Sequence, residues 1–303
     1  MMPTRQGSFR LFRLAGIDVF LHWSWFLAAA YELERRKEGW YSSPVGNVVE
    51  YLALFGLVTM HEFGHALACR QVGGQANQIV LWPLGGVAYV DPPQRPGATL
   101  WSIAAGPLVN VVLFPFLRQL LAAAGAAGWE ASAPDLYRLV QAIFYIDVGL
   151  LILNLLPIYP LDGGQILRSL LWFGLGRSRS LKAATIVGLV GAAGLLLLAL
   201  VKHNLWLGII AVFILLNCRQ GLRAAGILSR MDEAPRRAGF ECPSCHAEPM
   251  LGAFWRCGQC REPFDTFETG AACPKCGMQF TVTRCTDCGA THPLQAWITP
   301  PKL

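Results

Sequence analysis

Three ionisable side chains stand close together in the segment VTMHEFGHAL, residues 58–67. On a helix, His61 and His65 are four residues apart and share one face, and Glu62 lies one step around from His61. In this H-E-x-x-H pattern two imidazoles bind zinc, and the glutamate takes the proton of the attacking water. The pattern fixes only three positions and also occurs by chance. Three ionisable groups in one turn of an apolar segment are, however, difficult to explain by packing.

A catalytic zinc needs a third protein ligand and an open position for water. The best candidate is Asp162 in the segment NLLPIYPLDGGQILRSLLW, residues 154–172. Pro157 and Pro160 break the preceding apolar segment, so Asp162 follows on backbone that is free of a helix. Aspartate is also a preferred N-cap residue, and spacing alone leaves both the ligand role and the cap role open.

The elements that must position these residues are predicted to lie in a membrane. Of the 303 residues, 54% are hydrophobic and 15% are charged, whereas soluble proteins average about 25% charged residues. Arginines after the last apolar run mark a cytoplasmic face, so an even number of spans places both termini in the cytoplasm. The net charge of +6 comes from basic residues beside these spans, so no nucleic-acid partner is expected. The sequence thus predicts an α-helical polytopic membrane protein with about six transmembrane helices: residues 21–33, 48–68, 97–117, 139–156, 183–201 and 205–218.

Two segments between or before these spans are predicted to be extended. Residues 8–20 partly alternate and are expected to form short strands at the membrane face. The segment QIVLWPLGGVAYVD, residues 78–91, has two apolar arms around Pro83, Gly85 and Gly86 and is too short to cross. It is either a hairpin resting on the membrane surface or a re-entrant β-hairpin beside the active site, where protein or a water-filled cavity satisfies its backbone.

Eight of the ten cysteines form four C-x-x-C pairs near the C-terminus. Two such pairs supply the four thiolates of a structural zinc site. Pairs consecutive in sequence are predicted to share an ion, which gives a double zinc ribbon over residues 241–303, joined by a linker at 231–240 to a membrane domain at 1–230. Thiolate sites require a reducing compartment, in agreement with a cytoplasmic C-terminus. The expected ligand sets are Cys242, Cys245, Cys257 and Cys260, and Cys273, Cys276, Cys285 and Cys288.

Three motifs occur together in one order: HEFGH, then GPLVN at residues 106–110, then NLLPIYPLDGG at residues 154–164. In this order the motifs resemble those of the site-2 protease (M50) family of intramembrane zinc metalloproteases, over roughly residues 8–175. The resemblance implies that His61, His65 and Asp162 hold the catalytic zinc and that Glu62 is the general base. It also implies that Asn110 and Asn154 position the substrate or stabilise the oxyanion, although interhelical hydrogen bonding is an alternative for both asparagines.

Together with these features, the resemblance implies an intramembrane zinc endopeptidase that cuts within or near transmembrane segments of membrane proteins embedded in the lipid bilayer. Such a site would hold one catalytic zinc, and the ribbons two structural ions. An unwound substrate is expected to pair with the hairpin at Gly85 and Gly86, and a cytosolic regulatory protein to dock on the ribbons. The alternatives are a catalytically silent scaffold that recruits partners through its ribbons and a zinc transporter. The roles of Asp147 and His22 are left open.

Overall fold

The computed structural model describes residues 7–27, 29, 40–82 and 85–299. These residues form two compact units. The first comprises the membrane-type helices and one sheet, as far as residue 223, and the second is the cysteine-rich C-terminal part from residue 224 together with residues 93–95. Each unit is described by itself.

A four-stranded sheet forms from two separate parts of the chain, in the order β1-β2-β3-β4. Its strands are β1 (Ser8–Leu14), β2 (Ile17–His22), β3 (Gln75–Trp82) and β4 (Gly85–Asp91). The pairings β1–β2 and β3–β4 are antiparallel, and β2 runs parallel to β3. Apolar side chains of β2 and β3 are buried against α2 (Pro44–Gln71), which fixes the sheet beside the helix that carries the histidines. The prediction of short strands over residues 8–20 is confirmed.

Five helices within the described residues are long and apolar enough to cross a membrane. They coincide with the second to sixth predicted spans and mostly extend beyond them: α2, α3 (Pro96–Ala126), α5 (Pro134–Leu155), α6 (Asp162–Val201) and α7 (Leu205–Asp232). The predicted span over residues 21–33 is wrong at its start, because Leu21 and His22 end strand β2. Residues 28 and 30–39 of that region lie outside the described part of the chain.

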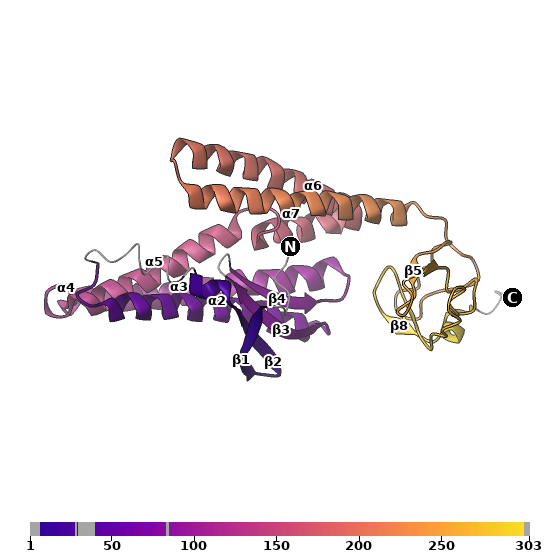
Figure 1. Cartoon of the computed structure of the whole chain (residues 1–303), viewed down its shortest axis with the longest axis horizontal. Coiled ribbons are helices and arrows are strands. Elements are labelled where there is room, and N and C mark those ends of the chain that lie inside the picture. Colours follow the sequence, from indigo (N-terminus) through magenta and orange to yellow (C-terminus); the bar gives the residue numbers. More distant parts are fainter. Residues whose placement is uncertain (1–6, 28, 30–39, 83–84, 300–303) are drawn as a thin grey trace. The chain divides into compact units, whose positions relative to one another are not determined.

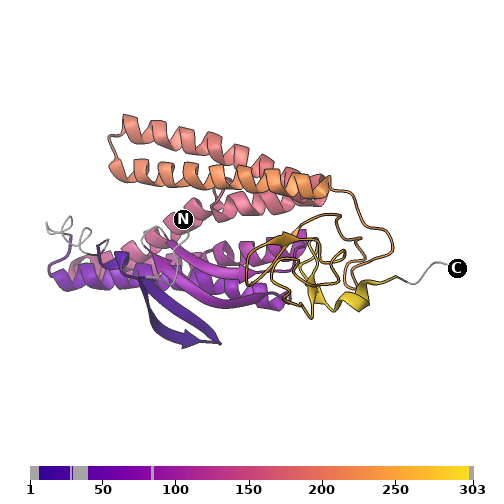
Figure 2. The ribbon, with the colours of Figure 1, turned by 45° about the vertical axis from the view of Figure 1, so that its right-hand side comes forward.

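The helices pack in two connected groups (Figure 1). Helix α2 contacts α3 and α5, and α3 also contacts α6. Helices α6 and α7 run side by side in both views, with Ile158, Ala192 and Ile214 buried between them (Figure 2). Helix α6 is broken at Gly176, whose φ of 78° and ψ of 176° are not helical. The short helix α4 (Trp129–Ser132) connects α3 with α5.

The cysteine-rich unit has little regular structure. It contains two hairpins, β5–β6 (Trp255–Arg256 with Pro263–Phe264) and β7–β8 (Thr283–Arg284 with Thr291–His292), and a 3-10 turn at Leu294–Trp297. Phe267 packs edge-on against Trp297 in its centre. Burial opposes ionisation of Asp265, but hydrogen bonds from the Gly252 backbone and the Arg237 guanidinium outweigh it, so the pKa of this carboxyl is held below its usual range.

Residues 231–240, predicted to be a linker, fall within the second unit. Helix α7 continues to Asp232, and the chain joins the cysteine-rich unit almost at once. The backbone of Leu251 donates to the Pro235 carbonyl at 2.8 Å, and Arg237 donates to the Pro249 carbonyl at 2.8 Å. These backbone hydrogen bonds, and an ion pair between Arg236 and Asp287, attach this segment to the cysteine-rich unit.

Candidate metal-dependent active site

The two histidines of α2 and the first residue of α6 converge on one point. His61 and His65 are buried, and their Nε2 atoms lie 3.1 Å apart. The Oδ2 atom of Asp162 lies 3.0 Å from His61 Nε2 and 3.3 Å from His65 Nε2. Ligands at the vertices of a tetrahedral zinc site, with bonds of about 2.1 Å, lie roughly 3.4 Å apart. These three donor atoms therefore fit a metal ion of this size. His61 and Asp162 are nevertheless 101 residues apart in the sequence.

Local backbone structure explains how Asp162 reaches this point. Helix α5 ends at Leu155, and the prolines at 157 and 160 separate it from α6. Asp162 begins α6, where the N-cap position belongs to Leu161 and no side-chain cap hydrogen bond forms. The aspartate is therefore not the cap of its helix, and its carboxylate faces the two imidazoles instead.

The other nitrogen of each imidazole has its own acceptor. His61 Nδ1 lies 2.7 Å from Asn110 Oδ1, and His65 Nδ1 lies 2.9 Å from the carbonyl of Ser102. Such partners hold a ring in the tautomer that keeps Nε2 available for a metal. Asn110 also donates from Nδ2 to Asp147 Oδ1 at 2.7 Å. The role of Ser102 was not predicted from the sequence, because its acceptor is the backbone carbonyl, which every residue has.

Glu62 lies on the same turn of α2 and faces strand β4. Its side chain is buried, and its Oε2 accepts a hydrogen bond of 2.8 Å from the Ala88 backbone. A Cβ atom added to Gly86 would lie 2.2 Å from Glu62 Cγ, so only glycine allows the strand to come this close. The expectation of a β-hairpin beside the active site is therefore confirmed. Pro83 and Leu84 at its tip lie outside the described residues.

A second glycine brings α3 against the histidine pair. A Cβ atom on Gly106 would lie 2.2 Å from His65 Nε2 and 2.8 Å from His61 Nε2. The segment GPLVN thus contributes both space for the two imidazoles, through Gly106, and the acceptor for one of them, through Asn110.

Not every candidate residue lies in this cluster. Asn154 is half-buried near the C-terminal end of α5. His22 ends strand β2, where its Nδ1 lies 2.6 Å from Ser24 Oγ. Asp147 is completely buried and is linked to the cluster by its hydrogen bond with Asn110. Gly85, the other glycine predicted to bind substrate, pairs with Trp82 where β3 and β4 meet the hairpin tip.

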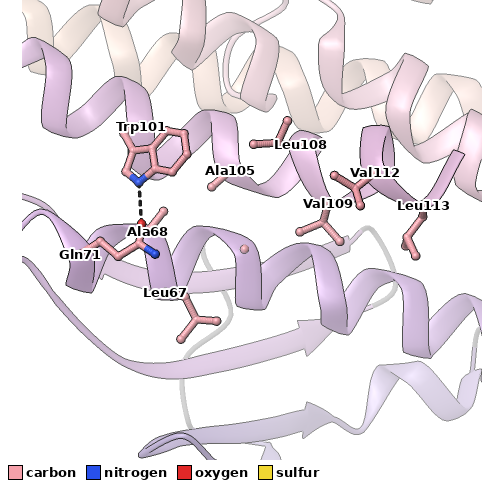
Figure 3. Close-up of a pocket in the computed structure, with 10 residues that line it drawn as sticks. Leu67, Ala68, Gln71, Trp101, Ala105, Leu108, Val109, Val112 and Leu113 are labelled. Atoms are coloured by element: carbon pink, nitrogen blue, oxygen red, sulfur yellow. Dashed lines mark hydrogen bonds between the residues drawn. The ribbon is translucent and has the colours of Figure 1, made fainter. Parts of the chain in front are cut away.

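An apolar groove of about 340 Å³ lies between α2 and α3, as Figure 3 shows. Its polar groups, Trp101 and Gln71, satisfy each other through a hydrogen bond of 2.9 Å from the indole nitrogen to the amide oxygen. The described residues that line the groove do not include the converging metal donors.

The cysteines form two four-membered clusters, but the predicted pairing is wrong. The first and last C-x-x-C pairs share one cluster, and the two middle pairs share the other. Phe240 forms a β-bridge with Ile298, and the Glu241 backbone amide donates to the Trp297 carbonyl. These contacts bring the two ends of the unit together, so the first C-x-x-C pair meets the last one and not the second. Sulfur atoms of a tetrahedral zinc site lie roughly 3.8 Å apart, and these lie close to that distance: Cys242–Cys288 3.7 Å, Cys245–Cys285 3.8 Å, Cys257–Cys276 3.5 Å and Cys260–Cys273 3.5 Å.

A helical bundle with membrane-type spans and a buried His-Glu-x-x-His and aspartate site defines the class of membrane-embedded metallopeptidases. Comparison with known proteins agrees: the profile of peptidase family M50 matches residues 49–126 and 121–198. The chain belongs to this family, the site-2 protease type of membrane metalloprotease.

Individual relatives give the same result. The chain is 29% identical over 222 residues to a zinc metalloprotease of Methanocaldococcus jannaschii, covering 73% of this chain and 62% of the relative. It is 33% identical over 124 residues to stage IV sporulation protein FB of Bacillus subtilis, covering 40% of each. The solved site-2 protease of Methanocaldococcus jannaschii aligns with a TM-score of 0.50 at 27% identity, over 71% of this chain and 95% of that one. The chain spans about three fifths of the length of the first two curated relatives that it matches.

Proposed function

We propose that the chain is an intramembrane zinc endopeptidase that hydrolyses peptide bonds within or near transmembrane segments of membrane proteins. One observation carries the proposal. The donor atoms of His61, His65 and Asp162 converge beside the carboxylate of Glu62, among helices long enough to cross a bilayer. A buried cluster of four ionisable groups is costly in such helices and is best explained by function.

The roles follow from the chemistry of each group. His61, His65 and Asp162 would hold zinc, which when bound polarises the scissile carbonyl and makes the attacking water more acidic. The carboxylate of Glu62 takes a proton from that water and delivers it to the leaving amine nitrogen. The hydrogen bond from Ala88 keeps Glu62 directed along β4 and leaves its other oxygen, Oε1, for the water.

Strand β4 is the surface that we propose binds the substrate. It is the last strand of the sheet among the described residues, and the Ala88 amide points to Glu62 rather than to β3. This edge of the sheet therefore lies beside the catalytic carboxylate. A helical peptide bond is shielded by its own hydrogen bonds, so an unwound substrate segment pairing with this edge would expose the bond. Gly85 and Gly86 allow close approach, and Asn154 is proposed to orient the bound segment.

The proposed complement of metal is one catalytic and two structural zinc ions, because the described residues contain one His-Asp cluster and two cysteine clusters. Thiolate sites persist in a reducing compartment, and Arg219, Arg223 and Arg230 follow the apolar part of α7. Both observations support cytoplasmic termini. Positive residues favour the cytoplasmic side of a span.

The substitution Glu62→Gln tests the proposed function. Purified full-length protein is reconstituted in vesicles with a labelled single-span peptide whose helix is interrupted by glycines. Glu62→Gln should reduce cleavage by at least about 100-fold and leave the zinc content unchanged, since Glu62 is not a donor to the site. Glu50→Gln is the matched control, because Glu50 is also a buried glutamate of α2 but bonds to Tyr41.

Two results would contradict the proposal. Wild-type cleavage by Glu62→Gln would remove Glu62 from the mechanism. Failure of the zinc-loaded wild-type protein to cut any of a panel of such peptides would favour the silent scaffold.

The cysteine-rich unit is proposed to dock a cytosolic regulatory protein. It has its own aromatic and cysteine core, separate from the proposed chemistry. Truncation after Asp232 retains all of α7 and removes both cysteine clusters of this unit. The truncated chain should still cut the peptide in vesicles but lose control over cleavage in cells. Loss of peptide cleavage by a folded, zinc-loaded truncation would instead assign the unit to the active site.

A further inference from the structure

Asp147 is a fully buried carboxylate on α5, and none of the roles proposed above uses it. We propose that Asp147 is a positioning residue: by holding the amide of Asn110 in one orientation, it sets the tautomer of His61. The inference rests on the proposed function, since it concerns how His61 presents its donor nitrogen to the catalytic zinc.

The contacts form a continuous chain from α5 to the site. Asn110 Nδ2 donates to Asp147 Oδ1 at 2.7 Å, and Asn110 Oδ1 lies 2.7 Å from His61 Nδ1. On the far side of the same ring, His61 Nε2 lies 3.0 Å from Asp162 Oδ2. Asn110 and Asp147 are both 0% exposed and His61 is 4% exposed, so water does not compete for these hydrogen bonds.

The asparagine amide is the element with two possible orientations. Its oxygen only accepts hydrogen bonds and its nitrogen only donates, while the two ends have nearly the same shape. With the oxygen toward His61, the ring carries its proton on Nδ1 and leaves the Nε2 lone pair for zinc. With the nitrogen toward His61, Nδ1 would have to accept, the proton would move to Nε2, and the metal would lose this ligand.

Asp147 selects between these orientations because a carboxylate is an acceptor. Only the amide nitrogen of Asn110 can satisfy Asp147, so the amide oxygen is directed to His61. The other carboxylate oxygen, Oδ2, is buried without a hydrogen-bond partner in the described part of the chain. A buried acid is expensive in a membrane helix, and the one side chain that Asp147 is seen to hold is Asn110.

The alternative role is a hydrogen bond that merely joins α3 to α5. The substitution Asp147→Asn separates the two roles. An asparagine at 147 still offers an interhelical hydrogen bond, so a joining role would be preserved. It no longer dictates which end of the Asn110 amide faces His61, so a positioning role would be lost.

The experiment measures zinc bound per full-length chain in detergent over a series of buffered free-zinc concentrations. The two cysteine clusters serve as an internal reference within the same molecule. Asp147→Asn should raise the dissociation constant of the catalytic ion by about 10–100-fold, the usual effect of losing a partner behind a metal ligand. The cysteine-bound ions should be unaffected. Thr185→Val is the control, because Thr185 is a buried polar residue whose hydroxyl donates to the Leu181 carbonyl of its own helix.

Exchanging the side chains at positions 110 and 147 should restore binding of the catalytic zinc. Asn110→Asp alone would place two carboxylates at hydrogen-bond distance and should weaken catalytic zinc binding. Asn110→Asp combined with Asp147→Asn restores an acceptor for His61 Nδ1 and a donor to hold that acceptor. The double variant should therefore bind the catalytic ion nearly as tightly as wild type.

The outcomes separate this inference from the proposed function. If the wild-type protein binds only the cysteine-held ions, the proposed function fails. If wild type binds a further ion and Asp147→Asn binds it equally tightly, the positioning role is overturned. If Asp147→Asn does not fold, the swapped pair decides: tight binding of the catalytic ion supports the inference, and loss of that ion overturns it.

Discussion

The substitution Gly106→Ala is the sharpest test of how the site is assembled. Helix α3 approaches the two imidazoles so closely that one added methyl group has no room. Its Cβ would lie 2.2 Å from His65 Nε2 and 2.8 Å from His61 Nε2, the two atoms proposed to bind zinc. Glycine has no side chain that could take part in the chemistry, so the expected effect arises from the position of the rings or of α3.

The size of the effect follows from these distances. Ordinary van der Waals contact of a Cβ atom begins at 3.4 Å, so the methyl group is 1.2 Å too close to His65 Nε2. Ligand distances in metal sites vary by only about 0.2 Å. A shift several times this tolerance should displace His65 from the ion. We expect the dissociation constant of the catalytic zinc to rise by at least about 100-fold, with a similar fall in cleavage.

Zinc content and cleavage of the labelled peptide are measured on the same reconstituted preparation. Gly149→Ala provides the control, since it is also a helical glycine but nothing lies within 4 Å of its added Cβ. That variant should keep its zinc and be stabilised by about 0.5–1 kcal/mol through reduced chain entropy. Full catalytic zinc and wild-type cleavage in Gly106→Ala would refute the reasoning, because the close approach of α3 would then not constrain the ligands.

Three further outcomes follow. Asp162→Ala should remove the catalytic ion and leave both cysteine-bound ions, as counted by elemental analysis; an unchanged count would place the third ligand elsewhere. Cys242→Ser should make Cys285 reactive to a thiol reagent while Cys257 stays protected; the reverse pattern would restore the consecutive pairing. Because the pKa of Asp265 is lowered on folding, Asp265→Asn should destabilise the cysteine-rich unit by about 1–3 kcal/mol near neutral pH. This difference should stay constant above the unfolded-state pKa of about 4 and shrink as the pH falls from there through the lower folded-state pKa, as measured by hydrogen exchange; a constant difference at all pH values would contradict it.

The helices and the catalytic motif could be predicted because their signals are local. Long apolar runs predicted five of the six spans correctly, and four-residue spacing places His61 and His65 on one face in any helix. The role of Asp162 could not be derived in this way. Whether Asp162 is a metal ligand or a helix cap depends on whether the two histidines face its carboxylate. That is decided by the packing of α2 against the start of α6.

The cysteine pairing shows the same limit. Each C-x-x-C pair is a local signal, but the choice of partner pair depends on which ends of the unit meet. The bridge between Phe240 and Ile298 brings the first and last pairs together. Both residues are apolar and ordinary, so nothing in their type or spacing indicates the pairing. Interhelical hydrogen bonding was one of the alternatives for Asn110, but its partners His61 and Asp147 could not be predicted, because they lie on other helices.

The buried polar groups also explain how such a site is compatible with an apolar bundle. His61 is bonded to Asn110, His65 to the Ser102 carbonyl and Glu62 to the Ala88 amide. These partners come from α3 and the sheet, and the proposed third ligand comes from α6. Polar groups buried without partners are costly, so α2 alone would be unfavourable as an isolated span. The cost is removed only when the other elements have assembled around it. Packing of the bundle and formation of the zinc site are therefore one coupled process, and a substitution that loosens α3 should release the catalytic zinc before it exposes the apolar core.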